Sequence, residues 1–233
     1  MGLSSLQSRH IVLSGVSRGV GNRLAHGLLS AGARVSVCAR SADALVDFHA
    51  LDQANAHALD ITERAAVDHW ITTGVQAFGP IDAVINNAAI LGSMQPIAEY
   101  KPDDWAAVMA VNVTGTFQVT QATLPHVVRP GGIYLHVSSY LGRHGLERYG
   151  AYSASKFGVE GLAQVLAEEH RAEGIISCAI DPGMIQTDML RAAMGTDDVS
   201  DHHSVDDATN AFMNVLKTIT MDDSGKPINL WTE

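Results

Sequence analysis

The sequence predicts a single α/β domain with a doubly wound, mostly parallel sheet. Short apolar runs alternate with longer stretches of helical periodicity along all 233 residues, as in repeated strand-helix-strand units. The short runs are too continuously apolar for half-exposed strands, so we expect helices on both faces of the sheet. A hydrophobic fraction of 46% with only 17% charged residues is typical of a globular core rather than a disordered chain.

The expected elements follow one another along the whole chain. Seven runs have the length and apolar character of strands: His10–Ser14, Arg34–Ala39, Ala56–Leu59, Ala83–Asn86, Ile133–Val137, Ile175–Ile180 and Ile228–Trp231. Six stretches between them have helical periodicity: Val20–Ala31, Ala42–Leu51, Glu63–Phe78, Pro102–Leu124, Ala151–Glu173 and Val205–Thr218. We therefore expect one domain over residues 1–233, with residues 1–8 flexible and the segment 184–204 forming a substrate lid.

Charge and composition exclude several classes of partner. Asp and Glu outnumber Lys and Arg by 25 to 15, and no basic stripe could neutralise phosphates, so we expect no nucleic acid partner. No stretch approaches the ~18 apolar residues of a membrane span, and the first residues lack the apolar core of a signal peptide. We therefore expect a cytoplasmic protein. Cys38 and Cys178 lie in apolar runs without metal-ligand spacing, which favours core packing over a disulfide.

A glycine-rich turn follows the first expected strand and leads directly into a helix. Its sequence is Ser14-Gly15-Val16-Ser17-Arg18-Gly19-Val20-Gly21. The glycines permit a tight turn and a close approach of the backbone to a pyrophosphate, while the helix N-terminus offers free N–H groups to the phosphates. This order of strand, turn and helix indicates a dinucleotide site.

The same turn also matches a second kind of site. Gly15 to Gly19 has the G-x-S-x-G pattern of a serine hydrolase, with Ser17 as the nucleophile. However, an oxyanion N–H has to come from an earlier loop, and only one strand precedes Ser17. A serine hydrolase is thus the less favoured alternative.

A second cluster carries candidate catalytic groups. Tyr152 and Lys156 are four residues apart at the start of an expected helix, so they share one helix face. A nearby ammonium favours the phenolate, so we expect Lys156 to lower the pKa of Tyr152 towards the range of a general acid/base. Asn112 and Ser139 lie upstream, the latter just after an expected strand.

In their order and spacing, these motifs resemble those of the short-chain dehydrogenase/reductase family over essentially the full chain. The matching motifs are the turn at 15–21, Asp60-Ile61, Asn86-Asn87-Ala88-Ala89, Asn112, Ser139, Tyr152-x-x-x-Lys156, and Asp181-Pro182-Gly183 with Thr187. The chain departs from the family at Ala89, where Gly is usual, and at residues 225–233, which lack the usual glycine-rich ending.

The resemblance implies an oxidoreductase that moves a hydride between a nicotinamide and a carbonyl or secondary alcohol. Tyr152 is then the general acid/base, Ser139 hydrogen-bonds the same substrate oxygen, Lys156 holds the nicotinamide ribose, and Asn112 anchors a water leading to Lys156. The remaining cofactor-binding positions that the resemblance implies are Gly15, Ser17, Arg18, Gly19, Val20 and Gly21 in the turn, Arg40, Asp60, Ile61 and Asn87, and Pro182, Gly183, Ile185 and Thr187 over the nicotinamide.

Two arginines indicate which cofactor is preferred. Family members that prefer NADH usually carry an acidic residue at the end of the second strand, where this chain has Ala39 followed by Arg40. Arg18 adds a second cation in the glycine turn. Both favour the 2′-phosphate of NADP(H), with NAD(H) left open.

The sequence also bears on the substrate, the assembly and one further class of protein. Methionines and other apolar residues in the expected lid favour an apolar or mixed pocket for a small-molecule substrate, and no residue set has the spacing of a metal site.

Pro102–Leu124 and Ala151–Glu173 are too apolar for one buried face, so we expect a homodimer, with a homotetramer left open. A non-catalytic NADP(H)-binding regulator is the alternative function.

Overall fold

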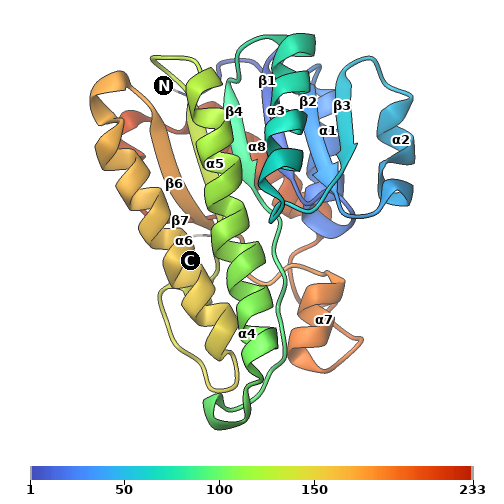
Figure 1. The fold of residues 1–233 in the computed structure, drawn as a ribbon, viewed down its shortest axis with the longest axis vertical. Helices are drawn as coiled ribbons and strands as arrows, with labels where there is room; N and C mark the ends of the chain where they lie inside the picture. Colours follow the sequence, from blue (N-terminus) through green and yellow to red (C-terminus); the bar gives the residue numbers. More distant parts are fainter. Residues whose placement is uncertain (1, 232–233) are drawn as a thin grey trace.

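The computed structural model of the protein describes residues 2–231, and a seven-stranded parallel sheet runs through it in the order β3-β2-β1-β4-β5-β6-β7 (Figure 1). The strands are β1 (His10–Ser14), β2 (Arg34–Ala39), β3 (Ala54–Ala58), β4 (Ala83–Asn86), β5 (Ile133–Val137), β6 (Ile176–Asp181) and β7 (Ile228–Asn229). The order reverses between β1 and β4, which is where ligands bind in open α/β sheets.

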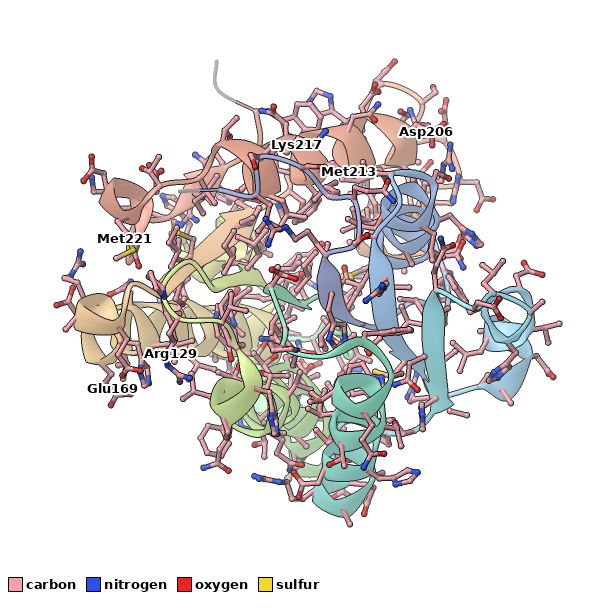
Figure 2. All side chains as sticks on the ribbon, turned by 90° about the horizontal axis from the view of Figure 1, so that it is seen from above. Arg129, Glu169, Asp206, Met213, Lys217 and Met221 are labelled. Carbon is pink, nitrogen blue, oxygen red and sulfur yellow. The ribbon has the colours of Figure 1, made fainter. Side chains whose placement is uncertain are left out.

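Helices cover both faces of the sheet. They are α1 (Gly19–Ser30), α2 (Val46–His49), α3 (Arg64–Phe78), α4 (Pro102–Met109), α5 (Thr116–Thr123), α6 (Gly150–Glu169), α7 (Asp188–Met194) and α8 (Val205–Thr218). Figure 2 shows α8, marked by Asp206, Met213 and Lys217, on one side of the sheet with α1, and α3 and α5 on the other. The predicted doubly wound α/β class is confirmed.

Side chains of β1 show how the sheet fills two cores. Ile11 and Leu13 pack with α1 and α8, whereas Val12 points the other way and packs with α3 and α5. All three are at most 1% exposed, because successive side chains of a strand covered on both faces alternate between two buried layers. This explains why the strands read as continuous apolar runs.

The predicted boundaries hold best for the central strands. β1, β2, β4 and β5 have the predicted bounds, and β6 is shifted by one residue. β3 begins earlier than predicted because this edge strand is only partly buried and carries a weak apolar signal. β7 is shorter than predicted, since only Ile228 and Asn229 pair with β6.

The helices differ from the prediction in four places. The predicted helix Pro102–Leu124 is α4 and α5 joined by a π-helical segment, Ala110–Gly115. The predicted Ala151–Glu173 ends as α-helix at Glu169, and only the short α2 with one preceding 3₁₀ turn lies within Ala42–Leu51. A further helix, α7, lies within a segment that the sequence indicated only as a lid.

Residues 2–8 are packed against the fold rather than loose, which corrects the expectation of a flexible start for this part; Met1 lies outside the described residues. Leu3 and Leu6 are 5% and 3% exposed, and the Leu3 N–H donates to the Leu216 carbonyl at 2.8 Å. Leu3 and Leu6 belong to the core that α8 covers, so their burial holds the segment down. Within residues 2–231, no helix combines the length and the apolar character that crossing a bilayer requires.

Candidate active site

A cavity of about 1040 Å³ opens at the carboxyl ends of the strands. Parallel strands bring these ends to one edge of the sheet, so loops that are far apart in sequence meet there. Every predicted site residue except Asn112 lines this cavity, from Gly15 in the first loop to Thr187 after the sixth strand. The sequence motifs therefore form one site.

Two glycines of the turn between β1 and α1, Gly15 and Gly21, have no room for a side chain. Gly15 has φ of 77°, and a Cβ there would lie 2.7 Å from the Ala88 Cα. A Cβ at Gly21 would lie 2.2 Å from the Gly15 carbonyl oxygen. The residue before α1, Arg18, gives no side-chain cap, so the N–H groups of the first helical turn remain available for an anion. The turn thus fits a pyrophosphate.

Asn87 holds this turn against β4. The Asn87 side-chain amide donates to the Ser14 carbonyl at 3.1 Å and to the Gly15 carbonyl at 2.9 Å. In return, the Ser14 hydroxyl accepts from the backbone N–H groups of Asn87 and Ala88 at 3.1 and 3.2 Å. The Asn87 amide NH₂ therefore fixes the shape of the turn, while the residue also lines the cavity.

Two arginines lie at the same end of the cavity as the glycine turn. Arg40 directly follows β2, is exposed, and forms no ion pair among residues 2–231. Arg18 lies 3.6 Å from Asp188, and both side chains are mostly exposed. Arg40 is thus the freer cation of the two.

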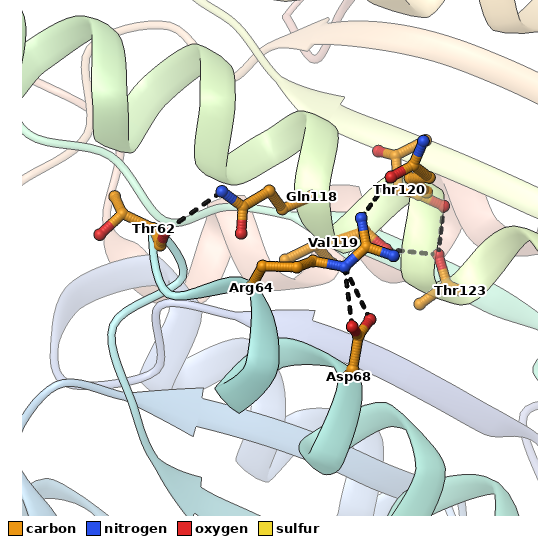
Figure 3. Close-up of polar contacts among 8 residues, drawn as sticks. Thr62, Arg64, Asp68, Gln118, Val119, Thr120 and Thr123 are labelled. Atoms are coloured by element: carbon orange, nitrogen blue, oxygen red, sulfur yellow. Dashed lines mark hydrogen bonds and ion pairs between the residues drawn. The ribbon is translucent and has the colours of Figure 1, made fainter.

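The loop after β3 is held by contacts with α5 (Figure 3). The Asp60 carboxylate accepts from the Thr62 backbone N–H and hydroxyl at 2.9 and 2.8 Å, and the Thr62 carbonyl accepts from Gln118 at 3.1 Å. A Cβ at Gly115 would lie 2.6 Å from the Ile61 side chain, so that glycine leaves space for Ile61. These contacts place Asp60 and Ile61 at the cavity wall.

Ser139, not its neighbour Ser138, is the serine that interacts with Tyr152. The Ser138 hydroxyl is buried without a hydrogen-bond partner in the described residues, whereas the Ser139 side chain lies close enough to the Tyr152 phenol to lower its pKa. The pKa of Tyr152 is raised to about 12, because burial and, to a smaller extent, the nearby Asp181 charge raise it by more than the Ser139 side chain lowers it. At neutral pH the phenol is therefore protonated and able to donate.

The pKa of Tyr152 is raised in this structure, which corrects the expectation that Lys156 brings it down towards neutrality. Its ammonium lies 5.6 Å from the centroid of the Tyr152 ring and donates to the Val137 carbonyl at 2.6 Å. Burial, at 3% exposure, lowers the pKa of Lys156 itself to about 8, and Glu160 opposes this shift. Helical spacing places the two residues on one face, but the β5 carbonyl decides where the ammonium points.

Asn112 lies beside the site rather than in the cavity wall. It is 1% exposed in the π-helical segment, and its side chain exchanges two hydrogen bonds with the Ile90 backbone at 2.8 and 2.9 Å. Its amide also donates to the Ser155 hydroxyl at 2.9 Å. Asn112 therefore ties the loop after β4 to the helix that carries Tyr152 and Lys156.

The segment 184–204 approaches the glycine turn at Thr187 and Asp188. Thr187 caps α7, with its hydroxyl accepting from the Leu190 N–H at 3.2 Å, and its methyl group lies 3.3 Å from where a Gly19 Cβ would be. The two ends of the segment are joined where Gln186 donates to the Ser200 and His202 carbonyls at 3.0 and 2.6 Å. In Figure 1, α7 lies beyond the end of the sheet.

Trp231 is a cavity-lining residue that the sequence analysis did not identify. Its ring stacks on His203 with centroids 3.7 Å apart, and its N–H donates to the Pro182 carbonyl at 2.6 Å. A Cβ at Gly183 would lie 2.7 Å from the ring. The available signal was an aromatic residue that closely follows the last strand.

The geometry does not provide a hydrolase triad at Ser17. Histidines that hydrogen-bond other groups in residues 2–231 are His10, His57, His136, His144 and His170, and Ser17 is not among their partners. The Ser17 hydroxyl instead lies in the glycine turn at the cavity.

Comparison with known proteins identifies the family. The short chain dehydrogenase family model matches residues 9–198. The chain is 43% identical over 119 residues to the uncharacterized oxidoreductase YciK of Escherichia coli K12. This match covers 51% of this chain and 47% of YciK, about half of each. It is 33% identical over 197 residues to an NADPH-dependent pterin aldehyde reductase of Arabidopsis thaliana, covering 82% and 81% of the two chains.

Solved structures agree with the sequence matches. A short chain dehydrogenase of Escherichia coli CFT073, in complex with NADPH, superposes with a TM-score of 0.88 at 28% identity, covering 98% of this chain and 99% of that one. The chain belongs to the short chain dehydrogenase family of oxidoreductases.

Proposed function

We propose that this protein is an NADPH-dependent reductase of carbonyl compounds, with Tyr152 as the proton donor. The observation that carries the proposal is the single cavity in which the glycine turn and Arg40 meet Ser139 and Tyr152. Similarity to an NADPH-dependent aldehyde reductase and to a dehydrogenase in complex with NADPH supports the same cofactor here.

Residues of this chain fit the cofactor at both of its ends. The glycine turn and the first turn of α1 would hold the pyrophosphate, and Arg40 with Arg18 would hold the 2′-phosphate. Asp60 and Ile61 would flank the adenine, and residues 182–187 would cover the nicotinamide, whose role when bound is to supply the hydride.

The chain supplies the proton and stabilises the developing charge. As the carbonyl oxygen becomes negative, the Tyr152 phenol donates its proton to that oxygen. The Ser139 hydroxyl donates a hydrogen bond to the same oxygen, which stabilises charge that exists only as the transition state forms. Lys156 would hold the nicotinamide ribose from its place beside the Val137 carbonyl.

The segment 184–204 is proposed to be the lid of this site within one domain that spans the chain. The Tyr149 hydroxyl donates to the Ala193 carbonyl at 2.7 Å, which links the lid to the start of the catalytic helix. Excluding water in this way strengthens hydrogen bonds at the reacting oxygen.

The proposed function is tested by NADPH oxidation against a panel of aldehydes, ketones, diketones and 3-oxoacyl esters. We expect at least one compound to be reduced, and reduction with NADH to be slower. Tight NADPH binding without turnover of any compound would favour the non-catalytic regulator instead.

We also propose a homodimer through α4, α5 and α6, with a tetramer left open. Large apolar side chains on these helices are exposed: Trp105, Phe117, Phe157 and Val165 are 38%, 44%, 48% and 54% exposed. Gly161 has no heavy atom within 4 Å of its Cβ position, so the α6 surface between Phe157 and Val165 is open to a second copy. Exposed apolar surface of this kind usually marks an interface.

Charge on this surface is expected to separate the subunits. Phe117→Glu with Val165→Glu should halve the mass measured by light scattering, because each buried carboxylate would lose its hydration. Val46→Glu is the matched control, since Val46 is 63% exposed on α2. A mass of 24.7 kDa for the unmodified protein at micromolar concentration would contradict the dimer.

A further inference from the structure

Charged side chains are unevenly distributed along the cavity. The residues that carry them are Arg18, Arg40, Asp60, Lys156, Asp181, Asp188 and Asp201. Two of the three cations lie at the glycine-turn end, where the proposed function places the phosphates. The third, Lys156, is buried and donates to the Val137 carbonyl. Within the described residues, no free cation thus lines the cavity beyond Tyr152.

The wall beyond Tyr152 is apolar on two sides. The lid contributes Met184, Met189, Leu190 and Met194, and the facing loops contribute Leu91, Leu141 and Leu146. Methionine side chains are flexible and adapt to ligands of irregular shape. This wall would cover a hydrophobic body without fixing its outline closely.

Several polar groups on this wall are already engaged. The Tyr149 hydroxyl donates to the Ala193 carbonyl at 2.7 Å. Under the proposed function, the Ser139 hydroxyl donates to the reacting carbonyl oxygen. Asp181 accepts from the Gly183 N–H at 2.9 Å, and its charge already disfavours the Tyr152 phenolate. Asp201 adds a second carboxylate at the lid end.

We infer that the substrate is an uncharged, largely hydrophobic aldehyde or ketone whose reacting carbonyl is its main polar group, and that anionic carbonyl compounds are excluded. This inference rests on the proposed function. A carboxylate placed on the methionine and leucine wall would lose its hydration and find no cation, while Asp181 and Asp201 would repel it.

Three benzaldehydes test this inference because they share one ring and one aldehyde. They are 4-methylbenzaldehyde, methyl 4-formylbenzoate and 4-carboxybenzaldehyde, with pyruvate as a small anionic carbonyl compound. We expect kcat/KM for the two neutral aldehydes to exceed that for 4-carboxybenzaldehyde by about a hundredfold. The methyl ester is the closest control for the carboxylate. Its ester group withdraws electrons from the aldehyde at least as strongly as the carboxylate does.

A charge-complementing variant sharpens the test. Met184→Lys and Met194→Lys each place an ammonium on the lid wall, so at least one should raise kcat/KM for 4-carboxybenzaldehyde relative to the ester by about tenfold. Val46→Lys, on α2 and outside the cavity, adds the same charge and should leave the ratio unchanged.

The outcomes separate this inference from the proposed function. Reduction of 4-carboxybenzaldehyde or pyruvate with a kcat/KM equal to or above that of the best neutral compound would overturn the inference and leave the reductase intact. Failure to reduce any carbonyl compound of either charge would overturn the proposed function instead. Reduction of neutral compounds alone would support both.

Discussion

Replacing Tyr152 by Phe is expected to lower kcat for carbonyl reduction by about a thousandfold while NADPH binding changes by less than about tenfold. The phenol lies beside Ser139 in the cavity, and its raised pKa of about 12 keeps it protonated at neutral and mildly alkaline pH. Phenylalanine keeps the aromatic ring but has no hydroxyl proton to donate to the substrate oxygen. Single-turnover rates and NADPH titration measure the two effects separately.

Tyr134→Phe is the matched control for this variant. Tyr134 is fully buried away from the cavity, and its hydroxyl shares a hydrogen bond of 3.0 Å with Thr123. The control therefore loses one phenol and one hydrogen bond, at a cost of about 1 kcal/mol in stability, with kcat retained. If Tyr152→Phe keeps more than about a tenth of the kcat, general acid catalysis by Tyr152 is refuted.

The second large effect is expected at Arg40. The unmodified protein should bind NADPH on the order of a hundredfold more tightly than NADH, since each charged hydrogen bond to the 2′-phosphate contributes about 1.5–3 kcal/mol. Arg40→Asp should narrow or reverse this preference, because a carboxylate repels the phosphate and accepts from the ribose diol of NADH. Kd values for both cofactors measure the change.

Arg34→Asp controls for the altered net charge. Arg34 is exposed at the opposite end of the same strand and does not line the cavity, so this variant should keep the preference for NADPH. Arg18, which already lies 3.6 Å from Asp188, should matter less than Arg40. Equal Kd values for NADPH and NADH in the unmodified protein would exclude the proposed cofactor preference.

Local sequence was sufficient wherever a residue's role depends on its immediate neighbours. The glycine turn was predictable because a positive φ at Gly15 and close backbone contacts at Gly21 tolerate no side chain. The spacing of Tyr152 and Lys156 was predictable because the helix repeat places them on one face. Neither prediction required knowledge of a distant contact.

Contacts between distant segments decided what spacing could not. The Lys156 ammonium points to a β5 carbonyl, and the pKa of Tyr152 depends on burial, Ser139 and Asp181. The π-helical segment at Asn112 accompanies its hydrogen bonds to Ile90. Such partners are remote in sequence, so helical periodicity does not predict them.

The sequence by itself determined the central strands, the order of motifs along them and hence the edge of the sheet at which they meet. These features follow from apolar runs and turn residues, whose preferences act locally. Only the tertiary structure decided that Trp231 stacks on His203, that Thr187 at the start of α7 lies beside Gly19, and that no free cation among the described residues lines the cavity beyond Tyr152. These features depend on which side chains the folded chain brings together. The burial and the electrostatic environment of a residue depend on every segment that packs around it, including segments distant in sequence.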